Sequence, residues 1–578
     1  MQETPSFAPD CVATLAELII AMSEFTANHL TAVAQLTGAG APFEVFDRQC
    51  GDYSVKAYRH AETNLRSVMA PGRGFGDALF IEYPGQSWTF DAFFAAVDAL
   101  AGYLQQHCGV AAGARVAIAM RNRPEWLIAF TAIMECGGVA VPLNSWGKSA
   151  ELQQGLEDSA AGVVICDAPR LDYILETGHA VTTVVVDPGE QQEADHRFAD
   201  ALTAALKPSP VEVQPSDPAI LLFTSGTAGR PKGALFTHDN ACQSLMNIEL
   251  IGAATYLTNT EAMTAQMSAG TPSKTLLAVP LFHISGLFSQ FIINLRHGRG
   301  LYMMYKWDAD EALRLVRESG ITVLMGAPTM LLDLLAREDV DASDFSAIAN
   351  LSAGGADTPP LLHDLYRQKS PDALAGAGWG LTESGGTGAA FTGHFMHERP
   401  GSSGFPSPIM EFRFCDEMGQ AVPDGDPGEM WVRSAATISG YVSGETGGEA
   451  FQEGWLQTGD IGYIDSEGLL YICGRAKDMV LRGGENIYPS EVEATLLEHP
   501  HCEEVAVIAL PDATLGEIPA AVIKTTPGAS LTASEWEHWC GARMAAYKVP
   551  AEWRFTDQPL PRNAVNKLLK HTIREQFF

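Results

Sequence analysis

Short, nearly continuous apolar segments alternate along this chain with segments that carry apolar residues at helical spacing. A strand that is apolar on both faces has to be buried on both faces, which is typical of a parallel sheet covered by helices. The alternation therefore predicts an α/β protein with packed, mostly parallel sheets. Strands are expected at residues 115–120, 163–166, 184–187, 219–223, 276–280 and 321–325, and residues 1–60 are expected to be mainly helical.

Local sequence signals mark the starts of three helices. Trp88-Thr89-Phe90-Asp91 precedes an amphipathic pattern, and Pro124 suits the first turn of a second helix. Ser490 and Glu493 are three residues apart before an apolar run, which predicts a capping box at the start of a third helix.

The size and charge of the chain restrict its organisation and its partners. At 578 residues it is too long for one ordinary core, so at least two domains are expected. The formal net charge of −33 repels phosphate backbones and disfavours a nucleic-acid binder. A site for a phosphorylated small molecule therefore has to be a local region of positive charge. The sequence leaves a monomer and a homodimer both open.

Cysteine spacing and hydropathy bear on the location of the protein. The ten cysteines are scattered and none forms a Cys-x-x-Cys pair, which argues against a zinc ribbon or a disulfide framework. No basic and apolar signal peptide opens the chain, and the longest apolar runs fall short of the ~20 residues that cross a bilayer. We expect a reduced, soluble, cytoplasmic protein without a transmembrane segment.

A loop rich in glycine and hydroxyl residues follows the apolar segment 221–223 and ends at Lys232. Glycine lets the backbone approach a ligand closely, and successive loop N–H groups can then point at one anion. Gly233 follows Lys232, so this is not a Walker A loop, which needs Gly-Lys-Ser/Thr. An ordinary Gly/Ser loop after a strand is the alternative. The residues expected to hold phosphate are Thr224, Ser225, Gly226, Thr227, Gly229 and Lys232.

The loop closely resembles the signature of the adenylate-forming superfamily, which includes acyl-CoA synthetases, luciferases and peptide-synthetase adenylation domains. Ala228 stands where a second threonine is commoner. Other motifs appear in the family's order and spacing from about residue 80 onward, and their conjunction is far more specific than any single loop. The chain most resembles an acyl-CoA synthetase or fatty-acid–CoA ligase.

The segment Gly378-Trp379-Gly380-Leu381-Thr382-Glu383 resembles a superfamily motif that usually reads Tyr-Gly-Leu-Thr-Glu. The resemblance implies that Thr382 contacts the α-phosphate of ATP and that Glu383 holds Mg²⁺, with Trp379 and Gly380 bordering the nucleotide. One carboxylate together with ATP oxygens is a usual way to hold Mg²⁺. Read alone, Glu383 would be a surface carboxylate.

Three further motifs complete the nucleotide site by resemblance. The turn at residues 352–356 is similar to the loop that lies against the adenine, and it contributes Gly354, Gly355 and Ala356. A carboxylate after a tight Thr-Gly turn suits both ribose hydroxyls, and Asp460 occupies that position. Arg475, in the next motif, would reach the nucleotide.

The segment around Phe282 lies where the superfamily lines its substrate pocket. Relatives that activate amino acids have an aspartate after the phenylalanine, whereas this chain has His283. An imidazole cannot pair with an α-ammonium group as a carboxylate does, which argues against an amino-acid substrate. A histidine packed at a strand end is the alternative for His283. Together with Trp379, this apolar neighbourhood favours an aliphatic or aromatic monocarboxylate.

The resemblance implies a large N-terminal domain of residues 1–476 and a small, mobile α/β domain of residues 477–578, with a hinge at Lys477. Gly483 and Gly484 would lie beside the pantetheine channel. Lys567 matches the family's catalytic lysine, although Asn566 replaces the usual glycine before it. Asparagine tolerates left-handed backbone better than other non-glycine residues, so the loop can keep its shape.

The family resemblance implies an ATP-dependent acid–thiol ligase that uses ATP, Mg²⁺ and coenzyme A and acts on a small carboxylic acid. Thr382, Glu383 and Lys567 would act in catalysis, and Lys477 would be the pivot. An acyl-AMP ligase that loads a carrier protein uses the same motifs and stays an alternative. A peptide-synthetase module is disfavoured because no carrier domain is seen after Lys567. The intact motif residues argue against a catalytically inactive binding protein.

Overall fold

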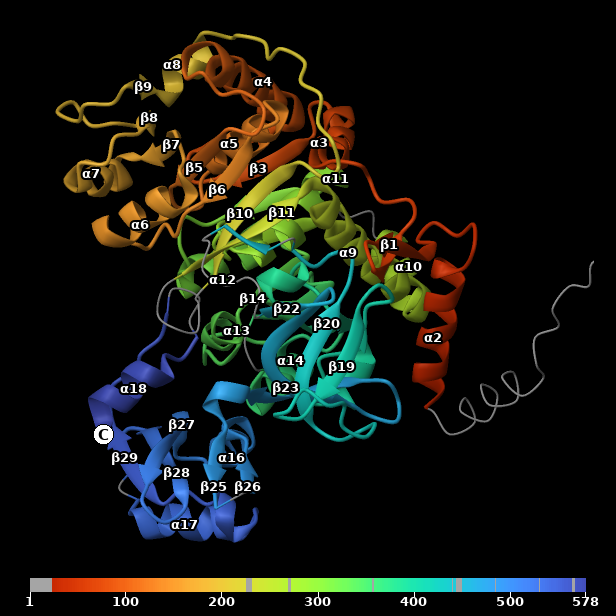
Figure 1. Ribbon diagram of the computed structural model, residues 1–578, viewed down its shortest axis with the longest axis vertical. Coiled ribbons are helices and arrows are strands. Elements are labelled where there is room, and N and C mark those ends of the chain that lie inside the picture. Colours follow the sequence, from red (N-terminus) through yellow and green to blue (C-terminus); the bar gives the residue numbers. More distant parts are fainter. Residues whose placement is uncertain are drawn as a thin grey trace, which may run out of the picture.

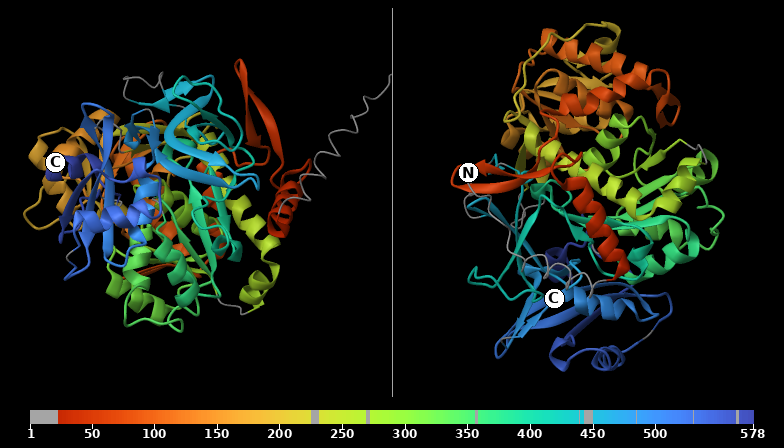
Figure 2. Two further views of the ribbon diagram at one scale, coloured as in Figure 1. Left: turned by 90° about the horizontal axis from the view of Figure 1, so that it is seen from below. Right: turned by 90° about the vertical axis from the view of Figure 1, so that its right-hand side faces the viewer.

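The computed structural model describes residues 23–224, 231–268, 272–355, 358–438, 440–442, 450–483, 485–529, 531–563 and 567–578. Figures 1 and 2 show a large N-terminal part built from sheets and helices, and a smaller C-terminal α/β lobe. Within these residues, no helix combines the length and the apolar character that a membrane crossing requires.

The first sheet has eight strands and is parallel from β10 to β9. β11 pairs antiparallel with β10. The phosphate-loop candidate joins these two strands, so it begins and ends at the same end of the strand pair. In spatial order the strands are β21 (Gly440–Tyr441), β11 (Lys232–Thr237), β10 (Pro218–Thr224), β6 (Val139–Pro142), β5 (Arg115–Ala119), β7 (Val163–Asp167), β8 (Thr182–Val186) and β9 (His196–Arg197).

The second sheet has nine strands and is parallel from β16 to β3, with antiparallel strands added at both edges. These two sheets confirm the predicted α/β class. In spatial order the strands are β18 (Phe405–Pro406), β17 (Ala389–Thr392), β16 (Leu374–Trp379), β15 (Asn350–Ala353), β14 (Val323–Gly326), β12 (Lys274–Leu277), β13 (Gly300–Met303), β3 (Leu79–Tyr83) and β4 (Gln86–Thr89).

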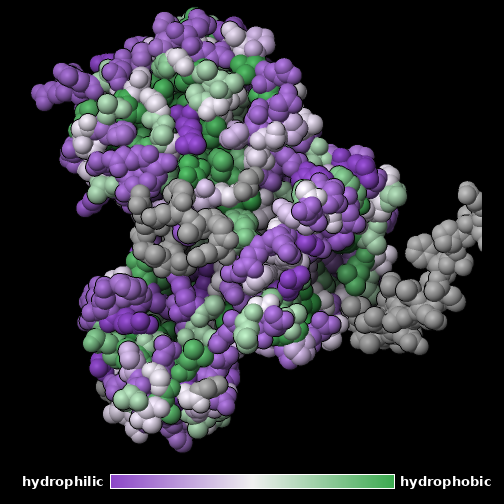
Figure 3. Space-filling view, in the orientation of Figure 1, coloured by the Kyte–Doolittle hydropathy of each residue, from purple (hydrophilic) through white to green (hydrophobic). Residues whose placement is uncertain are grey.

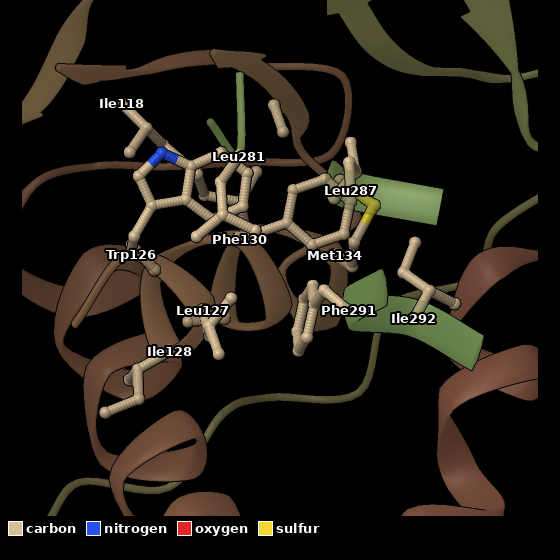
Figure 4. Close-up of a cluster of buried hydrophobic side chains, with 14 of the residues drawn as sticks. Ile118, Trp126, Leu127, Ile128, Phe130, Met134, Leu281, Leu287, Phe291 and Ile292 are labelled. Carbon is tan, nitrogen blue, oxygen red and sulfur yellow. The ribbon is translucent and has the colours of Figure 1, made fainter. Parts of the chain in front are cut away.

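A layer of helices between the two sheets forms the main core. Trp126 and Phe130 stack at 5.7 Å, and Phe130 meets Phe291 edge-on at 6.1 Å, as Figure 4 shows. Complete burial of each such side chain contributes about 1.5–3 kcal/mol of transfer free energy. The helices of this layer are α3 (Leu65–Met69), η1 (Ala70–Phe75), α4 (Phe90–His107), α5 (Pro124–Glu135), α8 (Phe198–Thr203), α9 (His238–Thr258), the π-helix η2 (Ser285–Ile292) and α11 (Ile293–Arg296).

Further helices cover the outer faces of the two sheets, so the strands are buried on both sides as their apolar sequences require. The predicted starts of α4 after Thr89 and of α5 at Pro124 are confirmed. On the first sheet the outer helices are α6 (Ser149–Ser159) and α7 (Ala168–Thr177), and on the second they are α12 (Ala309–Ser319), α13 (Pro328–Leu335) and α14 (Pro360–Lys369).

The N-terminal segment is only partly helical, so the prediction of a mainly helical extension over residues 1–60 is wrong for its second half. After α2 (Glu24–Thr37), the chain forms a hairpin from β1 (Val45–Cys50) and β2 (Tyr53–Tyr58). Gly51, at φ 61°, supplies the left-handed backbone that a two-residue hairpin turn needs. Apolar and polar residues alternate along β2, which is a strand pattern.

Two smaller sheets follow the second sheet. A five-stranded antiparallel sheet contains β19 (Glu411–Cys415), β20 (Gly428–Arg433), β22 (Phe451–Gln452), β23 (Trp455–Ile464) and β24 (Leu470–Arg475). The short helix η5 (Ala476–Asp478) then leads to a five-stranded sheet with its own apolar core. That sheet and its helices are β25 (Val480–Arg482), β26 (Glu485–Ile487), β27 (Cys502–Asp512), β28 (Gly516–Thr525), β29 (Glu552–Thr556), α16 (Pro489–Leu497), α17 (Ala533–Gly541) and α18 (Lys570–Phe577).

The predicted capping box at the start of α16 is wrong. The helix begins at Pro489, two residues before the start that a Ser490 N-cap would give, and Pro489 has no N–H to be capped. Ser490 therefore lies inside the first turn, and its hydroxyl donates to the carbonyl of Cys473 on β24. Glu493 instead accepts the Val507 N–H at 2.7 Å and pairs with Lys570 at 2.7 Å. Ser490 thus links the two sides of η5.

Glu467, in the turn between β23 and β24, holds the start of α2. Its carboxylate accepts the hydroxyls of Ser23 at 2.7 Å and Thr26 at 2.8 Å, and Arg399 donates to it at 2.6 Å. The hydrogen bond from Ser23, together with the Arg399 and Thr26 contacts, lowers the pKa of Glu467 to about 2, although burial acts in the opposite direction.

Glu467→Gln should lower the free energy of unfolding at pH 7 by about 1.5–3 kcal/mol, the range for hydrogen bonds to a charged group. Because the folded pKa is depressed, this contribution is present above the ordinary value of ~4.3 and is lost as the pH falls toward the folded value. The melting temperatures of wild type and variant, compared from pH 7 to pH 3, should therefore converge. Glu24→Gln, an exposed substitution in α2, is the control. A gap that stays constant with pH would contradict the assignment.

Candidate active site

Most of the predicted site residues line one continuous cleft of 3980 Å³ that residues of the large domain and the C-terminal domain share. Figure 3 shows the C-terminal domain as a lobe set off from the rest of the surface. The described residues that the structure brings together there are Thr224, Lys232, Phe282, His283, Gly354, Gly355, Trp379, Gly380, Thr382, Glu383, Asp460, Arg475, Lys477 and Lys567. Ser225, Gly226, Thr227, Gly229, Ala356 and Gly484 lie outside the described residues.

Glu383 ties the ends of the two large sheets together. Thr224, the last residue of β10, donates its hydroxyl to Glu383 Oε1 at 3.1 Å, and the Tyr441 hydroxyl on β21 donates to the same oxygen at 2.9 Å. Burial and the nearby Glu383 charge raise the pKa of Tyr441 far above its ordinary range, so this hydroxyl remains a donor. The Lys232 ammonium lies 5.3 Å from the Tyr441 ring centroid, within cation–π range.

This arrangement suits the oxygen chemistry of Mg²⁺. Glu383 offers a carboxylate at the mouth of the phosphate-loop candidate, and Mg²⁺ is usually held by one or two carboxylates, water and phosphate oxygens. The partner Tyr441 was missed by the sequence reasoning. Gly440-Tyr441 forms a two-residue edge strand that pairs with β11, and so short a strand has no recognisable sequence pattern.

Asp460 is held between two donors. Arg475, its register partner on β24, donates through Nε at 2.6 Å, and the Trp379 indole Nε1–H donates at 2.8 Å. Thr458 shapes the turn, since its hydroxyl accepts the Asp460 N–H at 3.0 Å. Asp460 is only 4% exposed, so its two oxygens keep a defined direction. A carboxylate oriented in this way can accept the hydroxyl protons of a ribose.

Trp379 and Gly378 point to opposite faces of β16, as neighbouring strand residues do. The Trp379 ring packs against the small antiparallel sheet, 5.6 Å from the Phe412 ring, and the residue also lines the cleft. Its indole N–H donates to Asp460, so Trp379 orients that carboxylate as well. Gly380 has to be glycine because a Cβ there would collide with the carbonyl of Gly386.

Phe282 and His283 follow β12 in a tight turn, with their ring centroids 4.2 Å apart. Burial lowers the pKa of His283 to about 4, so its imidazole is neutral at pH 7. Its buried Nε2 has no hydrogen-bond partner among the residues that the structure describes. A neutral ring with an open nitrogen can contact a substrate in the cleft without adding charge there.

Lys567 enters the cleft from the C-terminal domain. Its backbone N–H donates to Asn563 Oδ1 at 2.9 Å, and the Asn563 N–H donates to the Lys567 carbonyl at 2.9 Å. The neighbouring Arg562 acts electrostatically on Asp333 of α13, where burial raises the pKa of the carboxyl and the Trp307 indole and Arg562 oppose that rise. The segment that carries Lys567 therefore lies against the large domain.

The structure does not bring Gly483 into the cleft. Gly483, at φ 60°, forms the turn between β25 and β26 and donates its N–H to the Leu515 carbonyl at 2.7 Å. Lys477 lies in η5, between β24 of the large domain and β25 of the small one, and it does line the cleft. In this conformation Lys567, and not Gly483, lines the cleft together with the residues predicted to bind the nucleotide.

The comparisons with known proteins agree with this geometry. Residues 70–442 match the AMP-binding enzyme family, and residues 491–567 match the C-terminal domain of AMP-binding enzymes. The chain is 31% identical over 501 residues to feruloyl-CoA synthase of an Amycolatopsis species, covering 86% of this chain and 96% of that protein. It therefore belongs to the AMP-binding enzyme family.

Two solved structures share the fold. One is the o-succinylbenzoate CoA synthetase of Bacillus subtilis, in complex with its acyl-adenylate intermediate, at a TM-score of 0.73 and 29% identity over 89% of this chain and 98% of that one. The same enzyme has also been solved with ATP and a magnesium ion. The other is ATP-bound MatB from Rhodopseudomonas palustris, at a TM-score of 0.76 and 28% identity over 89% of this chain and 99% of that one.

Asp460→Ala should weaken ATP binding by about 1.5–3 kcal/mol, because the proposed ribose acceptor is removed. Trp379→Phe keeps the ring in its apolar site but deletes the indole donor, and it should weaken ATP binding by only about 1 kcal/mol. Calorimetric titration of ATP measures both values, and melting temperatures check that the variants fold. An ATP affinity that is unchanged in Asp460→Ala would place the ribose elsewhere.

Proposed function

We propose that this enzyme joins a carboxylic acid to coenzyme A in two half-reactions that share the cleft described above. ATP-dependent acid–CoA ligation through an acyl-AMP intermediate, with Mg²⁺, is the activity of the acid–CoA ligases to which the chain is similar. The observation that carries the proposal is the convergence, on one cleft, of the Thr224–Glu383–Tyr441 network, the Asp460–Arg475 pair and Lys567. Each belongs to a different part of the fold.

In the first half-reaction, a carboxylate oxygen of the acid attacks the α-phosphorus of ATP. The bond from that phosphorus to the bridging oxygen breaks, and pyrophosphate leaves with the electron pair. Carboxylate and triphosphate repel each other, so positive charge and hydrogen-bond donors have to be in place beforehand. Lys232, Lys567 and the hydroxyl of Thr382 would supply them. Glu383 would hold Mg²⁺, which neutralises phosphate charge when it is bound.

In the second half-reaction, the CoA thiol gives up its proton to solvent as sulfur attacks the acyl carbonyl carbon. The bond from that carbon to the AMP phosphate oxygen breaks, and AMP leaves with the electron pair. The C-terminal domain, residues 477–578, would rotate about Lys477, withdraw Lys567 and bring Gly483 and Gly484 to the thiol channel. The hydrogen bond from Ser490 to the Cys473 carbonyl spans this pivot and would have to open during the rotation.

The names of the relatives favour a ring-containing acid over a fatty acid. Feruloyl-CoA synthase and 2-succinylbenzoate–CoA ligase both act on acids with an aromatic ring, so the expectation of fatty-acid metabolism has no support from them. We therefore assign an aromatic carboxylic acid as the substrate class.

The direct test is pyrophosphate release with a panel of carboxylic acids, with and without CoA. Acid-dependent release, together with CoA-dependent formation of AMP and a thioester, is expected. Release of pyrophosphate without thioester formation on CoA would instead favour an acyl-AMP ligase that loads a carrier protein. The absence of release with any acid would contradict the proposed function.

Lys567→Ala should slow acyl-AMP formation by ~10²-fold or more, as the loss of one charged transition-state contact does. Thioester formation from supplied acyl-AMP should fall much less. Lys524→Ala is the matched control, because Lys524 lies in the same domain and pairs with Glu503 at 2.6 Å. Equal losses of rate in the two half-reactions would contradict the assignment of Lys567 to acyl-AMP formation.

Lys477→Pro should restrict the pivot, because proline fixes φ near −65° and removes one N–H. Adenylation should largely survive, since Lys567 already lines the cleft, whereas thioester formation should fall by at least about tenfold. Lys477→Ala separates the loss of the side chain from the restriction of the backbone. Near wild-type rates for both half-reactions in Lys477→Pro would show that the pivot lies elsewhere.

A further inference from the structure

Gln290 is a buried amide that neither the fold nor the proposed function explains. It lies on η2, is 1% exposed and lines the cleft. Its Nε2 donates to the Met325 carbonyl at 3.1 Å, while its buried Oε1 has no hydrogen-bond partner among the described residues. The Met325 carbonyl can accept a hydrogen bond only from the NH₂ group of the amide. This contact therefore identifies Nε2 as the paired atom and Oε1 as the unpaired one.

Leaving a buried acceptor without a partner costs about 1–3 kcal/mol, and native proteins rarely do so without a reason. A comparison within the chain shows the ordinary case. Gln243 on α9 is 3% exposed, and both ends of its amide are satisfied by Tyr58, whose N–H donates at 2.7 Å and whose carbonyl accepts at 3.1 Å. Gln290 differs in having its acceptor left over beside a cleft.

The wall beside Gln290 is a row of register partners on one face of the second sheet. Met325, Ser352, Gly376 and Thr392 pair in turn across β14, β15, β16 and β17, and all four line the cleft. Gly376 accommodates the Ser352 side chain, since a Cβ there would collide with Ser352 Oγ, and Thr392 Oγ1 lies close by. This row therefore presents hydroxyl groups beside Gly376 rather than a continuous apolar surface.

This row lies below the strand end where the chemistry takes place. Gly378, two residues further along β16 on the same face, is about 6.6 Å from Gly376 at strand rise, and Thr382 and Glu383 follow it. An acid whose carboxylate is near Thr382 would therefore extend its far end toward Gly376 and Gln290. Ligand pockets typically place a few polar groups in this way to fix the orientation of an otherwise apolar ligand.

We infer that Gln290 Oε1 accepts a hydrogen bond from a hydroxyl group at the far end of the acid, so that the enzyme selects hydroxylated aromatic acids. The inference rests on the proposed function and narrows its substrate class. An alkyl chain would leave the buried acceptor unpaired. A second carboxylate, which is only an acceptor when ionised, could not pair with it. The hydroxyl-bearing type of relative is thus favoured over the dicarboxylate type.

The test compares acids that differ only at the far end. Wild-type enzyme is assayed by pyrophosphate release with benzoate and cinnamate, with their 2-, 3- and 4-hydroxy isomers, with their 4-carboxy analogues and with octanoate. At least one hydroxylated acid should exceed its unsubstituted parent in kcat/KM by about tenfold or more, because sites that bind a substrate hydroxyl discriminate strongly against its absence. Gln290→Met, similar in shape but without the acceptor, should abolish this preference, measured as the ratio of kcat/KM for the hydroxylated acid to kcat/KM for its unsubstituted parent.

Gln243→Met is the matched control, since it deletes a similarly buried amide that does not line the cleft and should keep the preference for hydroxylated acids. A preference that survives in Gln290→Met would overturn the inference. So would a wild-type enzyme that favours an unsubstituted, alkyl or dicarboxylic acid, although the proposed acid–CoA ligation itself would then stand. No pyrophosphate release with any acid would instead contradict the proposed function itself.

Discussion

The hydrogen bonds to Glu383 are the constraint on which the site depends. Thr224 ends a strand of the first sheet, Glu383 follows the last parallel strand of the second, and Tyr441 comes from an edge strand more than fifty residues later. Two sheets that pack through a shared layer of helices could slide relative to each other. A single carboxylate oxygen accepts hydrogen bonds from both Thr224 and Tyr441, and so fixes the ends of the two sheets relative to each other. The phosphate-loop candidate and Glu383, the proposed metal ligand, meet at this point.

An ion pair connects the proposed ribose acceptor to the proposed pivot. Asp460 and Arg475 face each other on β23 and β24, and the chain turns into η5 directly after Arg475. The Trp379 indole extends the same network into the second sheet. A nucleotide that contacts Asp460 would therefore bear on the residue pair next to the hinge. The proposed pivot, Lys477, lies two residues beyond Arg475, the partner of the proposed ribose acceptor.

Local secondary structure was predictable from the sequence, whereas contacts between residues on distant strands were not. The α/β class and the starts of α4 and α5 follow from periodicity and from Thr89 and Pro124, all of which act within a few residues. The capping box failed because Ser490 finds its partner on β24, and the β1–β2 hairpin was missed in a segment taken as helical. Tyr441 and the Trp379–Asp460 bond depend on how distant strands pair, which no local pattern encodes.

Rigidity is distributed in the way that a two-step reaction requires. The groups proposed to recognise acid and nucleotide, from Gln290 to Asp460, lie on strands and helices packed into the large domain. Lys567 and Gly483 instead belong to a small domain with a separate core, so they can exchange positions without disturbing that packing. The bond from Ser490 to Cys473 is then a contact of one stage only. Fixed groups of the large domain would hold the acid, and the movable small domain would carry Lys567. The bound acyl group could then stay in place while the residues around it change between the two half-reactions.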